Sequence, residues 1–273
     1  MNYKSFVCVA VRRTQRDALL TAISKMPNPV PISPSTRRII IKPSIYDPNL
    51  PGNTSFGMVK AVTEFFEDVA PLSIVESDNP VRKADEAFKA SGYESLVSER
   101  VNLVNLSKEP QISVQMSGHY LKESLLPRIL IENDFLVNLA TMKTQKGITM
   151  GAAIKNLFGL LPGEDKPKMH QHLSDVLIDL LIKFRPRLNI IDLTYFIEGD
   201  RSDSKVRQIG GIVLGPDAVA VDAYCAHLLG FNPLEVNYLR KAYDLGLGEA
   251  LIERIQVLGT AHQIEQLTTL TSR

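Results

Sequence analysis

The chain has 273 residues, 44% of them hydrophobic, and its 31 basic and 30 acidic residues leave a formal net charge of only +1. This length and apolar content allow a substantial buried core, and the even charge balance gives no electrostatic reason to expect nucleic acid or an anionic membrane as a partner. No stretch approaches the roughly 18 consecutive apolar residues of a membrane-spanning helix, and the N-terminus lacks the layout of a signal peptide, so we expect a soluble, cytoplasmic protein. Its two cysteines, Cys8 and Cys225, exclude an iron–sulfur cluster held by cysteines of this chain alone.

Runs of β-branched residues and runs with helical spacing alternate along the chain. In order, the sequence predicts strand 6–11, helix 17–25, strand 38–42, helix 55–69, strands 72–76, 101–106, 111–115 and 134–140, helices 149–161 and 173–184, strands 188–196 and 210–214, and helices 217–229 and 233–245. This alternation predicts an α/β fold with a mixed, largely parallel sheet flanked by helices. Because no internal repeat or linker is visible, we expect a single domain over residues 1–273, with 79–128 as a peripheral subregion.

The most informative segment is the apolar run 147–163, in which Lys155 is the only ionisable side chain between residues 149 and 161. An ammonium group buried without a partner is costly, so such a lysine is usually paired or bound to a ligand. Two cations and small residues precede the predicted helix, whose N-terminus would itself attract anions. We therefore predict an anion-binding corner over residues 143–156, built by Lys143, Thr144, Gly147, Thr149, Gly151 and Asn156.

Further ligand-binding candidates lie in the loops that follow predicted strands, because ligands of parallel sheets bind at the carboxyl ends of the strands. Lys42 ends one strand, and Glu76 and Asp78 lie at the end of another, although residues 76–79 could also form a simple turn. The glycine signatures of phosphate-binding loops and dinucleotide folds are absent, which disfavours both of those classes.

Asp222 is the counterpart of Lys155, because it is the single ionisable residue within the apolar segment 218–224. The two residues could form a structural ion pair between two core helices, or they could both belong to a site. Both interpretations remain open at the level of sequence.

Candidate metal ligands are His170 and His172, whose spacing allows two imidazoles to share an ion, together with Asp192 inside an apolar strand. The alternative for the histidines is a solvated loop at the start of the helix at 173. The acidic residues at 198–203 fit an exposed polar turn better than a cation site.

Several of these motifs together resemble the family known as domain of unknown function 362. They are Ile41-Lys42-Pro43-Ser44, Glu76-Ser77-Asp78, Asn138-Leu139-Ala140 with Lys143-Thr144, residues 149–159, His170, Ile191-Asp192, residues 217–222, Leu229-Gly230 and Gly246-Leu247-Gly248, within about residues 38–250. Many relatives carry a ferredoxin-like segment with clustered cysteines, which implies redox chemistry for them. This chain lacks that segment, so redox coupling would need a separate iron–sulfur electron carrier.

From these features we expect an enzyme that acts on a small anionic metabolite carrying carboxylate or phosphate, with Lys155, His170 and Asp222 as catalytic residues. The reaction could be that of an oxidoreductase or of a metal-assisted isomerase, for which the nickel-dependent lactate racemases are a remote analogy, and a divalent metal is the cofactor considered. The alternative is a non-catalytic accessory protein that binds a metabolite or a metal. The sequence specifies neither the substrate nor the oligomeric state.

Overall fold

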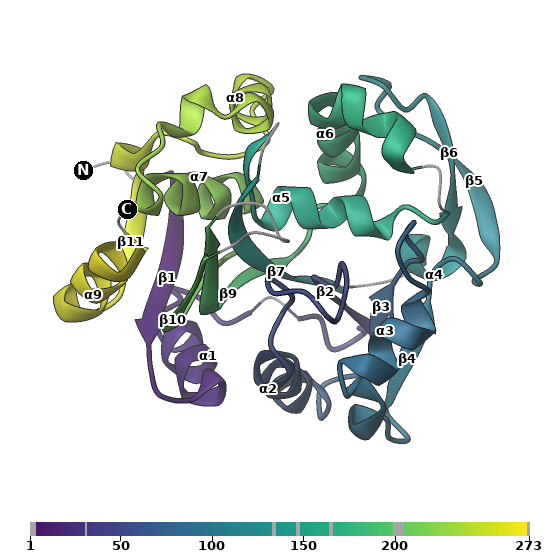
Figure 1. Cartoon of the computed structure of the whole chain (residues 1–273), viewed down its shortest axis with the longest axis horizontal. Helices are drawn as coiled ribbons and strands as arrows, with labels where there is room; N and C mark the ends of the chain where they lie inside the picture. Colours follow the sequence, from purple (N-terminus) through teal and green to yellow (C-terminus); the bar gives the residue numbers. More distant parts are fainter. Residues whose placement is uncertain are drawn as a thin grey trace.

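The computed structural model describes residues 4–30, 32–132, 135–145, 148–163, 166–198 and 205–271. Within these residues, a nine-stranded sheet has the order β11-β1-β10-β9-β7-β2-β3-β4, and β8 pairs with β7 (Figure 1). Its strands are β1 (Ser5–Val11), β2 (Ile39–Pro43), β3 (Leu72–Glu76), β4 (Val101–Asn105), β7 (Phe135–Gln145), β8 (Thr149–Gly151), β9 (Leu188–Glu198), β10 (Lys205–Gly215) and β11 (Ile255–Leu258). A separate two-stranded sheet pairs β5 (Gln111–Gln115) with β6 (Glu123–Pro127).

The pairing within the main sheet is mixed and mostly parallel. Strands β7, β2, β3 and β4 run parallel to one another, as do β7 with β9 and β1 with β11, whereas β10 is antiparallel to both of its neighbours and β8 is antiparallel to β7. The predicted fold class is confirmed: the protein is a single α/β domain.

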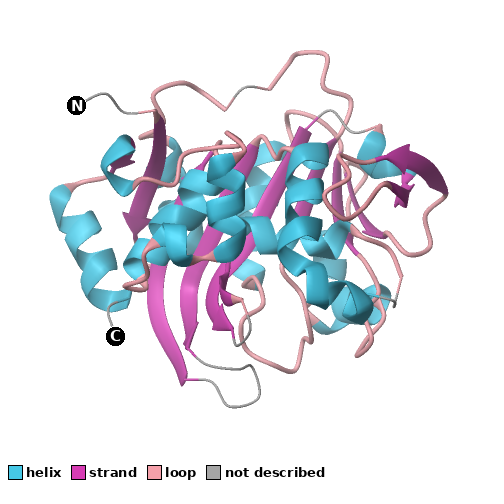
Figure 2. Cartoon of the chain, turned by 90° about the horizontal axis from the view of Figure 1, so that it is seen from above, coloured by secondary structure: helices cyan, strands magenta, loops and turns pink. Residues whose placement is uncertain are grey.

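Helices cover both faces of this sheet. The helices are α1 (Gln15–Ile23), α2 (Phe56–Phe66), α3 (Ala84–Ala90), α4 (Arg128–Ile131), α5 (Ala153–Asn156), α6 (Leu173–Phe184), α7 (Ala218–Leu228), α8 (Asn237–Asp244) and α9 (Ala261–Thr271). In Figure 1, α5 to α8 lie above the sheet and α1 to α3 below it. Seen from above, the strands run side by side beneath the upper helices (Figure 2). No described helix is long and apolar enough to cross a membrane.

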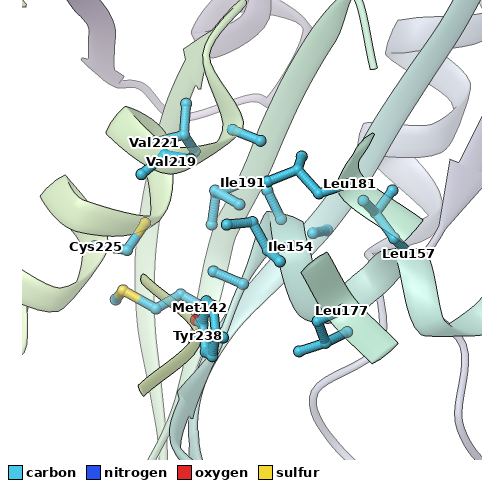
Figure 3. Close-up of a cluster of buried hydrophobic side chains, with 14 of the residues drawn as sticks. Met142, Ile154, Leu157, Leu177, Leu181, Ile191, Val219, Val221, Cys225 and Tyr238 are labelled. Atoms are coloured by element: carbon cyan, nitrogen blue, oxygen red, sulfur yellow. The ribbon is translucent and has the colours of Figure 1, made fainter. Parts of the chain in front are cut away.

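Each face of the sheet has its own apolar core, because successive side chains of a strand point to opposite faces. Val7 and Val9 of β1 belong to the core beneath α5 to α8, and Cys8 and Ala10 belong to the core that packs on α1 and α2. Figure 3 shows part of the first core, where Ile154 of α5 lies among side chains from α6, α7 and the sheet. This packing holds the short helix α5 in place.

Most predicted elements are found within a few residues of their predicted bounds, but the helix predicted at 149–161 is wrong. Its first three residues form β8, where Thr144 of β7 pairs with Met150. Only the four residues of α5 are α-helical, and the 3-10 helix η2 (Leu157–Leu160) follows them. Tertiary pairing with β7 therefore overrides the helical spacing of the apolar residues.

Other elements were not predicted from the sequence, namely α3, α4, β6, β11 and α9. The segment 79–128 is also divided between two sheets, because β4 belongs to the main sheet and β5 pairs with β6 in the separate sheet. The helix predicted at 233–245 begins at Asn237, after a 3-10 turn over Pro233–Glu235.

Candidate functional site

A cavity of about 520 Å³ lies at the carboxyl ends of β2, β3 and β7, the edge at which ligands of parallel sheets bind. The parallel register sets this edge, because Lys42 pairs with Asn138 and Ile41 pairs with Ile74. Its lining includes five cationic side chains and one carboxylate, namely Lys42, Arg82, Lys143, Lys155 and Lys166 with Glu76. The described lining is therefore strongly electropositive.

Lys42 and Glu76 form a buried ion pair at the base of the cavity. The Lys42 Nζ donates to Glu76 Oε2 at 2.9 Å and to the carbonyl oxygen of Pro43 at 2.6 Å, and both residues are at most 2% exposed. Burial lowers the pKa of Lys42, and the charge of Glu76 opposes that shift. Gly159 closes over the pair, since a Cβ at this position would lie 2.8 Å from the Lys42 Nζ.

Arg82 joins two loops of the cavity wall. Its guanidinium donates to the carbonyl oxygens of Ile45, Tyr46 (3.1 Å) and Ser77 (2.5 Å), and it lies 3.6 Å from Glu76 Oε2. A planar group with five N–H donors suits this convergence of carbonyl oxygens. Arg82 therefore fixes the loop after β2 against the loop after β3.

Lys143 lies in β7, directly after a bulge in the pairing of β7 with β9. Its Nζ donates to Thr141 Oγ1 at 2.7 Å and to the carbonyl oxygen of Gly52 at 3.0 Å, with Ser44 Oγ at 3.4 Å, and the residue is 7% exposed. The structure thus places the positive charge of Lys143 within the cavity, among hydroxyl and carbonyl oxygens.

Lys155 is half-buried on α5 and also lines the cavity. The aliphatic part of its side chain packs against Gly151, where an added Cβ would lie 3.2 Å from Lys155 Cγ. Its Nζ lies 4.8 Å from the centroid of the Phe158 ring, a distance typical of a cation–π contact. The lysine that dominates the sequence motif is therefore directed to the cavity.

Lys166 is the first residue of the 3-10 helix η3 (Lys166–His172), and sequence reasoning did not select it. The side chain is buried, and its Nζ donates to Ser77 Oγ at 2.5 Å and to the carbonyl oxygen of Asp78 at 3.1 Å. Burial lowers the pKa of Lys166 to about 8, with further lowering by the charges of Lys42, Arg82 and Lys155 and an opposing effect from Glu76. Lys166 therefore loses its proton more easily than a lysine side chain in water does.

Asp222 does not pair with Lys155. Its carboxylate accepts hydrogen bonds from the backbone N–H groups of Ala153 (2.6 Å) and Ile154 (3.1 Å) and from the Tyr238 hydroxyl (3.2 Å), and no ion pair between described residues joins it to Lys155. A carboxylate of the chain itself therefore lies at the start of α5, where free backbone N–H groups favour a negative charge. Asp222 thus fixes the start of α5 through these hydrogen bonds and is not part of the cavity lining.

Three hydrogen-bonded asparagine side chains fix α5 against the sheet. Asn156 Nδ2 donates to the carbonyl oxygen of Lys42 at 3.0 Å and to Asn138 Oδ1 at 2.8 Å, and Asn138 Nδ2 donates in turn to Asn189 Oδ1 at 3.0 Å. These bonds connect α5 to β2, β7 and β9. Asn156 lines the cavity, but its amide nitrogen is engaged in positioning Lys155 and Lys42.

The three proposed metal ligands lie in three different environments. His170 contacts the Phe158 ring and lines the cavity, His172 stacks on Tyr120, and Asp192 accepts hydrogen bonds from Ser55 and Thr194 within the core. The described residues contain no group of three or more His, Cys, Asp or Glu side chains arranged to hold a metal ion. In the described lining, the one carboxylate is already bonded to cations and backbone N–H groups, so these residues do not fit a cationic metal.

Eight of the residues predicted from the sequence meet in the cavity lining. They are Lys42, Glu76, Lys143, Thr144, Gly151, Lys155, Asn156 and His170. The lining does not include Asp78, Thr149, His172, Asp192 or Asp222. Asp78 instead accepts from the N–H of Ala84 at the start of α3, and Thr149 lies exposed in β8. Gly147, Asp200 and Asp203 lie outside the described residues.

Arg82 and Lys166 are the cations of the lining that the sequence did not reveal. Arg82 falls in the segment predicted to be peripheral, and Lys166 belongs to a Lys-Pro-Lys stretch typical of a solvated loop. Neither has a local pattern that indicates burial.

Comparison with known proteins gives the family of the chain. The sequence model described as "Domain of unknown function (DUF362)" matches residues 39–227. The chain belongs to this family. All the cavity residues named above, from Lys42 to His170, lie inside the DUF362 match.

Two proteins are similar to this chain, one in sequence and one in structure. A thylakoid-associated protein of Synechocystis sp. is 23% identical over 228 residues, which cover 79% of this chain and 70% of that protein. The lactate racemase apoprotein from Thermoanaerobacterium thermosaccharolyticum superposes with a TM-score of 0.51 at 12% identity, over 85% of this chain. The chain spans 58% of the length of that apoprotein, and the likeness shows that the fold is shared.

Proposed function

We propose that the cavity binds a small anionic metabolite through its carboxylate or phosphate group, and that the protein is an enzyme that acts on it. The observation that carries this proposal is the convergence of five cationic side chains and one carboxylate on one cavity, from β2, β3, the loop after β3, β7, α5 and η3. Gathering like charges in a partly buried space is unfavourable by itself, so an anionic ligand would relieve the repulsion.

The size and lining of the cavity support a small molecule. Its volume of about 520 Å³ lies within the range of small-molecule sites, roughly 300 to 1,000 Å³. Hydroxyl groups of Ser44 and Thr144 add neutral donors beside the lysines, while Tyr46 and Phe158 provide apolar surface. A ligand with an anionic group and a short carbon skeleton fits this combination.

Enzymatic activity is supported by the lysine whose pKa falls to about 8, since perturbed groups within a cavity are typical of catalytic sites. His170 at the same cavity could also transfer protons. Redox coupling to a separate iron–sulfur protein and a role as a non-catalytic accessory protein stay predictions from the sequence.

The test is binding of inorganic phosphate, pyruvate and malate at low ionic strength, measured by thermal denaturation and calorimetry. We expect these anions to raise the Tm, and added salt to reduce the effect because it screens charge. Lys155→Met should weaken binding by about tenfold or more, the equivalent of losing one charge-assisted hydrogen bond. Binders would then be incubated with the protein and followed by NMR for conversion.

The matched control is Lys60→Met, which removes an exposed lysine of α2 that lies outside the cavity. This variant should bind anions as the wild type does. Equal weakening in both variants, or equal stabilisation of the wild type by anions and by their neutral amides, would overturn the proposal.

A further inference from the structure

Lys166 differs from Lys42 and Arg82, its neighbours in the cavity, in the groups that hold its side-chain nitrogen. Lys42 and Arg82 both contact the carboxylate of Glu76, whereas no described carboxylate forms an ion pair with Lys166. The acceptors of Lys166 Nζ are a hydroxyl oxygen at 2.5 Å and a carbonyl oxygen at 3.1 Å. Neither of these neutral acceptors holds a proton on nitrogen as strongly as a carboxylate does.

The number of these hydrogen bonds also suits a neutral amine. An ammonium group has three N–H donors, but a neutral amine has two N–H donors and one lone pair. The hydroxyl of Ser77 and the carbonyl oxygen of Asp78 can accept both N–H bonds of the neutral form. Loss of a proton therefore costs Lys166 neither of its hydrogen bonds, and the lone pair remains for chemistry.

Burial favours the neutral form of Lys166, and the three cations that face it act in the same direction. Lys42 from β2, Arg82 from the loop after β3 and Lys155 from α5 act on it as like charges, and Glu76 at the end of β3 is the opposing charge. On its own 3-10 helix, His170 Nδ1 lies 3.2 Å from the carbonyl oxygen of Lys166. Together with burial, these charges bring the pKa of Lys166 to about 8.

We propose that Lys166 is a nucleophilic amine that forms an imine with an anionic carbonyl compound bound in this cavity. This inference rests on the proposed function, because the other cations would bind the anionic group of the ligand and bring its carbonyl carbon to Lys166. Desolvated lysines beside other cations are a recognised type of amine nucleophile.

The reaction is balanced without an oxidant or a reductant. The lone pair of Nζ attacks the carbonyl carbon and opens the C–O double bond. The oxygen then leaves as water with the two hydrogens of the amine, and a C–N double bond forms. The ligand class is therefore an aldehyde or ketone that also carries a carboxylate or a phosphate.

The test uses glyoxylate, a small aldehyde with a carboxylate, and cyanoborohydride, which reduces an imine to a stable secondary amine. Peptide mass spectrometry of the whole protein would compare Lys166 with Lys168, an exposed lysine of the same 3-10 helix. We expect Lys166 to be labelled at least about tenfold faster than Lys168 at neutral pH, with a pH midpoint near 8. Lys166→Met should lose the fast label, and Lys168→Met should keep it.

Propionaldehyde, which lacks the anionic group, separates this inference from the proposed function. Slower labelling of Lys166 by propionaldehyde than by glyoxylate supports both. Equally fast labelling by the two aldehydes would overturn the anionic ligand class. If glyoxylate labels Lys166 no faster than Lys168 while anions still stabilise the protein, the nucleophile is overturned and the anion site stands. The comparison of two lysines within the wild type decides this even if Lys166→Met does not fold.

Discussion

Asp222 anchors the short helix that carries Lys155. Three donors reach its buried carboxylate, two of them the backbone N–H groups at the start of α5. Burial raises the pKa of Asp222 to about 7, and the hydrogen bonds from Ile154, Ala153 and Tyr238 work in the opposite direction. Its role is to satisfy polar groups that the core would otherwise leave without partners.

Replacing Asp222 should therefore cost more stability than replacing Lys155. Asp222→Ala leaves two buried N–H groups and one hydroxyl without an acceptor, which predicts a loss of about 2 to 5 kcal/mol in the free energy of unfolding. Lys155→Met should change it by less than about 1 kcal/mol, because the lysine is half-buried and faces the cavity. Chemical denaturation of both variants and of the double variant would test this. Non-additive effects would contradict it and restore a direct coupling of the two residues.

Because of Lys166, the free energy of unfolding should change with pH in the alkaline range. The pKa of an ordinary lysine side chain is 10.5, and that of Lys166 in the folded protein is about 8. Between these two values the unfolded chain binds more protons than the folded protein does. The free energy of unfolding therefore rises with pH in this range. The shift corresponds to about 3 kcal/mol as an upper bound. Below pH 8, Lys166→Met should therefore be as stable as the wild type or more stable, with an advantage that shrinks toward pH 10.5. Urea denaturation over this range would measure the difference, and an advantage that grows with pH would contradict the expected sign.

At the scale of elements, one acidic side chain helps to attach the hairpin of β5 and β6, whose residues Leu121 and Leu126 also pack in the apolar core. Asp179 of α6 accepts hydrogen bonds from Ser117 Oγ and from the N–H groups of His119, Tyr120 and Leu121 in the connection between the two strands. These donors lower the pKa of Asp179, although burial opposes them. Within the described residues, the hairpin pairs with no strand of the main sheet, so this contact and the apolar packing hold it in place.

Asp179→Ala should consequently loosen the hairpin while leaving the sheet intact. We expect faster amide hydrogen exchange over residues 117–121 and little change in β7 and β9, because the sheet core does not depend on this carboxylate. Asp175→Ala is the matched control, since it removes an acidic side chain from the same helix that pairs with Lys241. Uniform acceleration across both sheets in Asp179→Ala would contradict a local role.

The elements also show where sequence patterns suffice. Strands at 39–43 and 72–76 are buried throughout, and their continuous β-branched and apolar runs identify them within a residue. The helix predicted at 149–161 failed because its apolar residues pack in three successive conformations, and nothing local reveals that Thr144 and Met150 pair across β7 and β8. Long-range pairing is not encoded in the spacing of one segment.

At the scale of the whole molecule, the sheet could be predicted and the cavity only in part. Strand and helix alternation predicts the layers, and residues that end strands, such as Lys42 and Glu76, follow from the position of ligands in parallel sheets. Arg82 and Lys166 reach the same cavity from loops whose course depends on contacts with distant residues. For this reason Asp222 looked like a site residue and Lys166 did not.

The guanidinium of Arg82 has a consequence for the thermodynamics of binding. Because it already ties the carbonyl oxygens of Ile45, Tyr46 and Ser77 together, both walls of the cavity are shaped during folding. A ligand then meets a preorganised surface and need not order these loops, which preserves affinity that flexible walls would lose to conformational entropy. The N–H groups of Arg82 are thus occupied by the protein, and their effect on affinity is indirect. They hold in place the loops beside the lysines that would bind the ligand.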